Sequence, residues 1–535
     1  MKNLVLCATL AFCVFYPGSG AFAGGETVTD SQRAQIDNFL LRMFQYDAKY
    51  PRLICGVDYR GPSAEESKGI EEMMAFKENA KEQMKGMGPK VIPLLLESVN
   101  ANGRKVQETI IETLAEMGQP TLSEIEKFLN DGRLNDFRGV GSDFPEIIEI
   151  LSKSKADNTA LISNMLKSKN LNCRLFALKA MSKLHKKIPA LNNLVEKSAS
   201  DIHETVRAAA IEVIALDSQS NKAHLDMVIQ AIRNDETSLV RTRAMNAMSV
   251  LAKELNSQDK AKYDAQLQEV LKTDHVKLAR SYASYAFDPN TRRRLIDENA
   301  PPVFKLQAKD SIYSSPLPKS ALIDKTKKAA LDASVSSILE QINTESHLMR
   351  ANYNPRKNTS FEQRGKASFD YFIFNRFARS KEQELRELGP DALESLIKYS
   401  NFGNVDSSAA CVSAILWFDY DSIPPLARAL EASDEKHPPP YLICATGARS
   451  NALFEQVLSE GSDNAKLSAL KILSYQLPRL NHHKSISHPI EVSPKLVRLV
   501  EKCMNSDNAQ VSEQAKVVRE QIDYSQCVLL VCHHR

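Results

Sequence analysis

Apolar residues recur at helical spacing through most of the chain, and the stretch 104–131 shows the pattern most clearly. Its first apolar positions lie three or four residues apart, on one face of a helix: Val106, Ile110, Leu114 and Met117. Gly118 follows where helices often end on a left-handed residue, and Pro120 suits the first turn of a new helix. We therefore predict two short antiparallel helices joined by a tight turn.

The second helix of this pair has an apolar face of its own: Leu122, Ile125, Phe128 and Leu129. Neither helix can bury its apolar face alone, so such a pair needs neighbours of the same kind. The same turn recurs elsewhere. Met87-Gly88-Pro89 precedes "VIPLLLESV", and Leu388-Gly389-Pro390 precedes "ALESLIKYS".

A second marker is an apolar residue followed by a basic one, early in the first helix of a unit. It occurs at Cys173-Arg174, Val206-Arg207 and Val240-Arg241, with spacings of 33 and 34 residues, and again at Val276-Lys277. Small alanines after these pairs allow close packing of neighbouring helices. A fixed spacing over successive units favours a repeat array over the alternative, a single amphipathic helix bundle.

These segments resemble the HEAT-repeat family of armadillo-type solenoids, which includes the short HEAT-like units of bilin lyases. The resemblance covers most of residues 65–285 and 380–525, and four segments carry it: "MGPKVIPLLLESV" (87–99), "VRAAAIEVI" (206–214), "VRTRAMNAMSVL" (240–251) and "LGPDALESLIKYS" (388–400). It implies an all-α fold, an α-solenoid of stacked antiparallel helix pairs. It further implies that the second helix of each unit lines a concave surface that binds a protein or peptide partner.

The pattern divides the chain into segments. We predict an N-terminal helix and loop at 24–64, a first array at 65–287, a proline-rich irregular connection at 288–330, a second array at 331–525 and a Cys/His tail at 526–535. A few identical residues recur at a constant offset between the two arrays. Either an internal duplication or the sequence pattern common to all the repeats would produce them.

Residues 1–23 have the form of a cleaved export signal of bacterial type. Lys2 supplies a positive start, Leu4–Tyr16 forms a short apolar run, and Ala21-Phe22-Ala23 is a small-x-small cleavage site. A lipoprotein signal ending at Cys13 is the alternative, but the bulky Phe12 precedes that cysteine. We expect an exported protein, periplasmic or secreted, and no later segment is apolar enough to span a membrane.

Composition and net charge limit the classes of partner and chemistry that we expect for this chain. Hydrophobic residues are 43% of the chain and charged residues 25%, as in ordinary folded proteins. The net charge of +3, from 69 basic and 66 acidic residues, gives no electrostatic reason to expect nucleic acid. The sequence has no phosphate-binding G-x-x-x-x-G-K-[ST], no G-x-S-x-G and no H-E-x-x-H motif. We therefore expect no catalytic residues and no bound cofactor.

Two histidine- or cysteine-bearing segments are the remaining candidates for chemistry. The first, "NHHKSISHP", contains His482, His483 and His488, which could hold a transition metal or simply form a polar loop.

The second is the tail "CVLLVCHHR". Cys527, Cys532 and His533 resemble a stretched haem-attachment motif, with four residues between the cysteines where the motif has two. A disulfide, plain thiols or a zinc site are the other interpretations. Of nine cysteines, two lie in the leader, so seven remain, an odd number; Cys173 and Cys411 fit buried core thiols.

The sequence thus supports two functions of different kinds. The first is a non-catalytic exported scaffold that binds a protein or peptide on its concave surface. The alternative is a protein that carries a metal or haem, or handles a cofactor as lyases do, through the 482–488 loop or the 527–532 tail.

Overall fold

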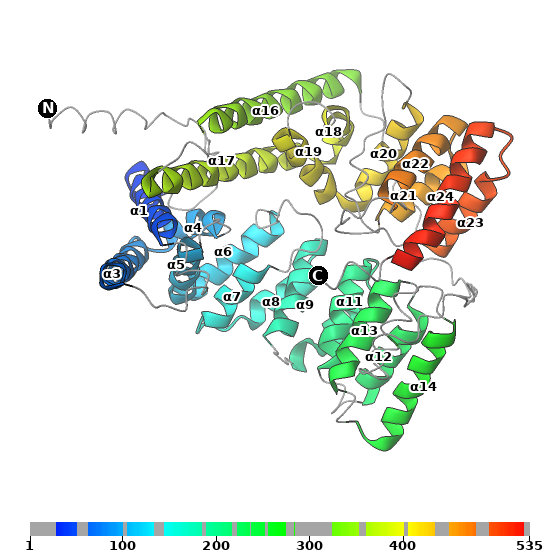
Figure 1. Cartoon of the computed structure of the whole chain (residues 1–535), viewed down its shortest axis with the longest axis horizontal. Helices are drawn as coiled ribbons and strands as arrows, with labels where there is room; N and C mark the ends of the chain where they lie inside the picture. The colour runs from blue at the N-terminus through cyan, green and yellow to red at the C-terminus, as the bar shows by residue number, and fades with distance from the viewer. Residues whose placement is uncertain are drawn as a thin grey trace.

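Helices are the only regular elements that the computed structural model describes (Figure 1). It covers residues 28–50, 63–99, 104–132, 144–184, 189–216, 222–235, 237–251, 255–273, 283, 324–352, 360–400, 405–433, 449–477 and 492–528. Within these ranges the predicted all-α fold is confirmed. The leader 1–23, Val276-Lys277 and residues 288–323 of the predicted connection lie outside the described residues.

Short helices follow one another through the first half of the chain. They are α1 (Asp30–Lys49), α3 (Ala64–Gly86), α4 (Ile92–Ser98), α5 (Arg104–Met117), α6 (Gln119–Asn130), α7 (Pro145–Lys153), α8 (Thr159–Lys167), α9 (Leu171–Lys183), α10 (Asn192–Ser198), α11 (Glu204–Ala215), α12 (Lys222–Asn234), α13 (Ser238–Leu251) and α14 (Ser257–Thr273). Successive units stack on one another: α9 packs on α11, α11 on α13, and α12 on α14. This is the side-by-side stacking of an α-solenoid.

Two long helices open the second half, and shorter ones follow. They are α16 (Lys325–Asn352), α17 (Phe361–Glu387), α18 (Leu393–Tyr399), α19 (Val405–Trp417), α20 (Ile423–Glu431), α21 (Arg449–Glu460), α22 (Asp463–Gln476), α23 (Pro494–Cys503) and α24 (Ala509–Val528). Here too α18 packs on α20, and α20 on α22. Helix α16 begins at Lys325, inside the stretch that the sequence pattern assigned to the connection.

The Gly-Pro turns have the geometry that the sequence predicted. Gly88 has φ of 79°, and Pro89 opens a short 3-10 helix (Pro89–Val91) that leads into α4. Gly389, with φ of 80°, repeats the arrangement before α18. Because φ values in this range strain any side chain with a Cβ, glycine is needed at both turns.

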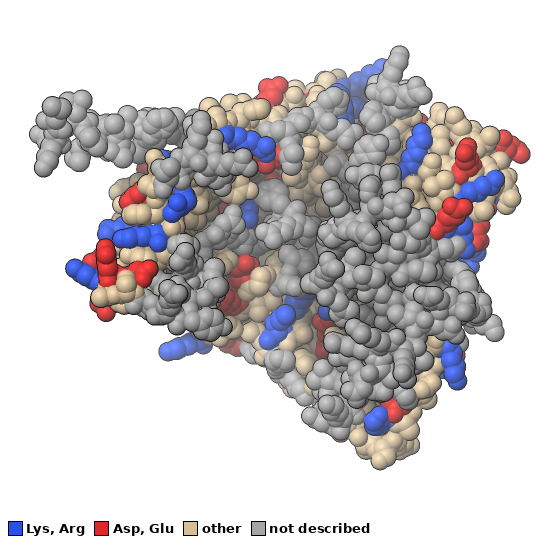
Figure 2. Space-filling model, in the orientation of Figure 1, with Lys and Arg blue, Asp and Glu red and all other residues tan. Residues whose placement is uncertain are grey.

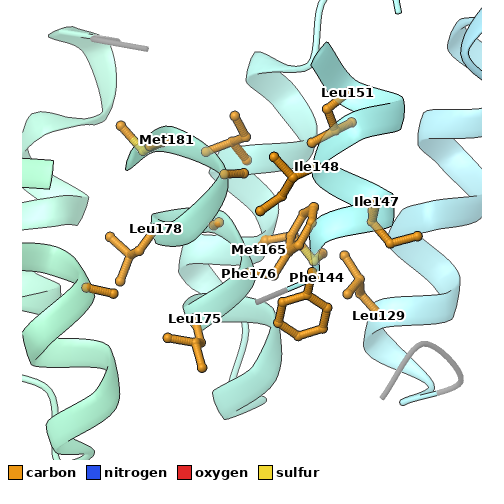
Figure 3. Close-up of a cluster of buried hydrophobic side chains, with 14 of the residues drawn as sticks. Leu129, Phe144, Ile147, Ile148, Leu151, Met165, Leu175, Phe176, Leu178 and Met181 are labelled. Atoms are coloured by element: carbon orange, nitrogen blue, oxygen red, sulfur yellow. The ribbon is translucent and has the colours of Figure 1, made fainter. Parts of the chain in front are cut away.

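Neighbouring pairs share one continuous apolar core. Figure 3 shows a part of it where α6, α7, α8 and α9 meet. There Phe144 and Phe176 pack edge to face, with ring centroids 5.5 Å apart. Around them lie buried apolar side chains from all four helices, among them Leu129, Ile148 and Met165. The core therefore belongs to the stack and not to any single pair.

Helix α17 joins the two halves of the chain. The buried apolar side chains form two clusters, one from Ile36 to Ala283 and one from Val335 to Ile522, yet Phe372 of α17 belongs to the first. Helix α1 packs along α17, and Arg376 donates to Asp37 at 3.0 Å. The sequence pattern did not predict that the first described helix would pack against a helix more than 300 residues later in the chain.

A buried charged group makes a second contact between the halves. Arg386 of α17 donates to the Gly132 carbonyl at 2.6 Å and to Ser413 Oγ at 3.1 Å, and it pairs with Glu382. Its guanidinium lies 5.0 Å from the ring centroid of Trp417. Burial lowers the pKa of Arg386 to about 10, so the group stays charged at neutral pH. Charged Arg386 is thus held by partners from both halves.

Candidate interaction surfaces

The basic residue of the repeat marker forms an Arg–Asp ion pair with the next unit, and we call each such pair a rung. Arg174 of α9 reaches Asp201, which precedes α11, through two parallel bonds: Nε to Oδ2 at 2.7 Å and Nη2 to Oδ1 at 3.1 Å. Its Nη1 donates to the carbonyls of Ser168 and Lys169 at 3.1 and 2.8 Å. A two-point pairing of this kind fixes the orientation of both partners.

The next unit repeats the rung almost atom for atom. Arg207 of α11 donates to Asp235 at 2.9 and 3.1 Å, and its Nη1 donates to the carbonyls of Asp201 and Ile202. Arg241 of α13 in turn donates to the Asp235 carbonyl at 2.7 Å. Only 2% of the Arg207 side chain is exposed, so this rung lies in the interior. The rungs hold successive units in register.

Sequence reasoning used these arginines only as spacing markers and missed their partners. A signal was present. Asp201 lies six residues before Arg207, and Asp235 lies six residues before Arg241. Each aspartate also caps its own turn, since Asp201 accepts from the His203 amide at 2.9 Å and Asp235 from the Thr237 amide at 3.0 Å. The repeated Asp-to-Arg spacing could therefore have predicted the rungs.

The second helices of the units carry their own row of polar contacts. Asn164 of α8 donates to Glu126 of α6 at 2.9 Å. His224 of α12 lies 3.0 Å from Glu196 of α10, and Lys262 of α14 pairs with Asp226 of α12. These contacts link α6 to α8 and α10 to α12 and α14, and α8 packs on α10. We name these five helices the second-helix face (α6, α8, α10, α12 and α14).

A shallow, open groove of about 580 Å³ lies between α16 and α17. The two helices run side by side along one edge of the molecule (Figure 1). Ala333, Ser334 and Ser337 of α16 form one wall, and Ile338 and Leu388 supply apolar surface. Two carboxylates from α17, Glu384 and Glu387, complete the lining, so the groove holds no basic side chain of its own.

Two lysines that precede the groove on α16 are engaged by carboxylates outside it. Lys327 pairs with Asp391 at 2.5 Å, and Lys328 pairs with Glu394 at 2.7 Å. The hydrogen bond from Lys328 lowers the pKa of Glu394, which keeps that pair ionised at neutral pH. The first pair links α16 to the 3-10 turn Pro390–Ala392 and the second links it to α18, so neither lysine is paired with a groove carboxylate.

Elsewhere the described surface carries mixed charge. On the face that Figure 2 shows, Lys and Arg side chains alternate with Asp and Glu, and no large area of one sign is visible among the described residues. None of the helices in the described part of the chain is long and apolar enough to cross a membrane.

The candidates for metal or haem chemistry lie outside what the structure describes. His482, His483, His488, Cys532 and His533 fall beyond the described ranges, and Cys527 lies in the last turn of α24 with its side chain not described. Within the described ranges no group of three or more His, Cys, Asp or Glu side chains could hold a metal. The metal and haem interpretations of these six residues stay predictions.

The three cysteines whose side chains the structure describes are buried free thiols. Burial raises the pKa of Cys173 to about 11 and that of Cys411 to about 12, and it also raises the pKa of Cys503. Thiols of this kind are unreactive at neutral pH, because the thiolate is the nucleophile. The prediction that Cys173 and Cys411 are core thiols is confirmed.

No family model matches this chain, and no curated protein matches its sequence. Solved structures that share similarity with it include the following two. An engineered protein solved by a structural genomics consortium is 11% identical, with a TM-score of 0.20, over 91% of this chain and 99% of its own. The protein She4p is 14% identical, with a TM-score of 0.23, over 93% of this chain and 66% of its own. Similarities this low carry no argument about activity or partners.

Proposed function

We propose that this chain is an exported, non-catalytic scaffold of the HEAT type, which binds a protein or peptide partner along its second-helix face. Stacked helix pairs present long surfaces whose shape is set by the stacking itself. The observation that carries the proposal is the pair of Arg–Asp rungs, since they hold successive units in a fixed register. A fixed register presents the second helices as one preorganised surface, which lowers the entropic cost of binding.

The second-helix face also offers side chains for recognition. Exposed lysines occur on three of its helices, at Lys127, Lys167 and Lys197. The cross-helix contacts of Glu126 and Glu196 place acids on the same helices, so the face presents both signs of charge. Mixed polar surface of this kind suits a protein partner more than nucleic acid, which needs a concentrated basic surface.

Site-specific photo-crosslinking tests this proposal. A photoreactive amino acid replaces Lys127, Lys167 or Lys197 on the second helices, and Lys183 or Arg243 on the first helices as matched exposed controls. Crosslinks to the same partner from all three second-helix positions, and from neither control, would support the proposal. Equal crosslinking from both sets, or crosslinking from the first helices alone, would refute the choice of face.

Export is a separate part of the proposal and rests on the leader pattern of residues 1–23. Fractionation of producing cells tests it, with N-terminal sequencing of the exported chain. We expect the mature chain to begin at Gly24, after the Ala21-Phe22-Ala23 site. Retention of the leader in the cytoplasmic fraction would contradict this expectation.

The visible spectrum and zinc content of the exported chain decide the alternative, a metal- or haem-carrying protein. Four residues separate Cys527 from Cys532, where the haem motif has two, so we expect no Soret band. A Soret band, or stoichiometric zinc that disappears in Cys532→Ser, would replace the scaffold proposal with the carrier.

A further inference from the structure

We propose that the groove between α16 and α17 is a second docking site, and that its occupant is a basic amphipathic helix of a partner protein. This inference rests on the proposed scaffold function only in that the occupant belongs to a protein. It concerns a different surface from the second-helix face, so either proposal can fail alone.

One row of α16 that continues from the groove is an uncharged strip, while the neighbouring row from Ala333 continues to the exposed Glu340. Ser334, Gln341 and Leu348 are seven residues apart, which places them on one side of the helix over about 21 Å. Ser337 and Thr344, also seven residues apart, lie on exposed turns between them. The cores of protein interfaces are depleted of charge in the same way.

Two hydroxyls of the strip are satisfied within their own helix. Ser334 Oγ donates to the Ala330 carbonyl at 3.0 Å, and Thr344 Oγ1 donates to the Glu340 carbonyl at 2.8 Å. Covering these two hydroxyls leaves neither donor without an acceptor, so a partner that buries them pays no penalty for an unmade hydrogen bond there. At the far end of the strip Leu348 is 54% exposed, the highest value among the exposed large apolar side chains of the described residues. It offers an apolar anchor point.

Charge selects the occupant at the other end of the groove. Glu387 is exposed and accepts from the uncharged Gln383 amide at 3.2 Å, so its charge is not neutralised by that contact. Glu384 forms an ion pair with Lys381 of the same helix, at 2.7 Å. No lysine or arginine lines the groove, while the carboxylates favour a Lys or Arg side chain. The same carboxylates repel nucleic acid and anionic lipid surfaces.

These features together specify the occupant. It needs a basic residue over Glu384 and Glu387, small or polar residues along the strip, and an apolar residue that reaches Leu348, about 21 Å along α16 from Ser334. A helix that spans this length has about 14 residues between the two ends. Recognition of an amphipathic helix in a groove between two helices is a common mode of peptide binding.

Peptide binding to the full mature chain tests the inference, followed by fluorescence anisotropy. The probes are three labelled peptides of about 18 residues, long enough to span the strip. The first is amphipathic with Lys and Arg on its polar face, the second carries Glu at those positions, and the third is a scrambled basic peptide. We expect the first to bind at least about tenfold more tightly than either of the others, with affinity falling as salt rises.

Two groove variants and one matched control locate the site. The double variant Glu384→Gln/Glu387→Gln and the single variant Leu348→Gln should each weaken binding of the basic amphipathic peptide about tenfold. The control Glu65→Gln/Glu71→Gln removes the same charge from the exposed face of α3 and should change affinity less than about twofold. All substituted side chains lie at or near the surface, and circular dichroism checks that each variant folds.

Several results would overturn the inference. Equal binding of the scrambled peptide would show that charge alone is sensed, and equal loss in the α3 control would show that the site is not the groove. A change of oligomeric mass in the groove variants, without a change in peptide affinity, would assign the groove to a second copy of this chain. If the groove results hold while second-helix crosslinks are absent, the proposed function fails and this inference stands.

Discussion

Replacing Arg207 by alanine perturbs the most buried rung between units. Among the hydrogen bonds of its guanidinium are four, two to Asp235 and two to the carbonyls of Asp201 and Ile202. Alanine removes all four and leaves Asp235, whose side chain is 11% exposed, without its cation. Asp235 keeps its bonds from the backbone and hydroxyl of Thr237, so the turn itself should persist. The loss therefore acts mainly on the contact between units.

The expected cost follows from burial. Removing one member of a buried ion pair typically costs about 3–5 kcal/mol, because the other charge stays buried and uncompensated. Arg243 provides the comparison: its side chain is 54% exposed and pairs with Glu212 at 3.2 Å, also across neighbouring units. Pairs as exposed as this contribute about 0–1 kcal/mol. We therefore expect Arg207→Ala to cost at least about 2 kcal/mol more than Arg243→Ala.

Urea unfolding followed by circular dichroism at 222 nm measures the difference, with linear extrapolation of the free energy of unfolding. A solenoid can unfold in steps, so hydrogen exchange of the α11 to α13 amides provides a local reading. Faster exchange there in Arg207→Ala, with α21 to α24 unchanged, is the expected result. The double variant Arg207→Ala/Asp235→Ala should recover part of the loss, since no charge is then left unpaired. Equal free energies of unfolding for Arg207→Ala and Arg243→Ala would refute the reasoning.

Two further predictions concern the junction and the thiols. Gly132 has φ of 70°, and a Cβ there would lie 2.4 Å from the ring of Trp417, the single tryptophan of the chain. Gly132→Ala should therefore shift tryptophan emission to the red. Gly88→Ala has open space around the new Cβ, so it should cost only the backbone strain of about 1–3 kcal/mol and leave the emission unchanged. Cys173 and Cys411 should resist iodoacetamide at pH 8, because their raised pKa values keep the thiols protonated, and both should react fully in urea. Peptide mass spectrometry measures the alkylation of each cysteine. Rapid alkylation of the folded protein would contradict the assignment of these thiols to the core.

Much of the fold could be predicted because its causes are local. Gly88 and Gly389 occupy positions that require a positive φ, and the proline after each opens the next helix. Each Gly-Pro pair therefore predicts one turn from the sequence alone. The apolar face of α5 is buried as its spacing predicted, with Val106, Ile110 and Leu114 fully inaccessible. Helical periodicity needs no tertiary information, since it depends only on which side chains must leave water together.

The candidate surfaces were harder to predict. The family resemblance pointed to the second helices. It did not predict the Arg–Asp rungs that hold the units in register, although Asp201 and Asp235 each lie six residues before an arginine of the repeat marker. The groove has no comparable signal, because Ser334 and Glu384 become neighbours only through the packing of α16 on α17. The histidines and cysteines singled out for chemistry lie outside the described residues, so their role stays a prediction.

The sequence by itself therefore determined the helices, their turns and the stacking of units, since each depends on contacts within one unit or with the next. Only the tertiary structure decided that α1 packs on α17 and that Arg386 joins Gly132 to Ser413. The contacts of α1 with α17 and of Arg386 with Gly132 span more than 250 residues of chain. The physical reason is that a repeat pattern specifies each unit's neighbours, while the closure of distant segments depends on how small rotations accumulate along the stack.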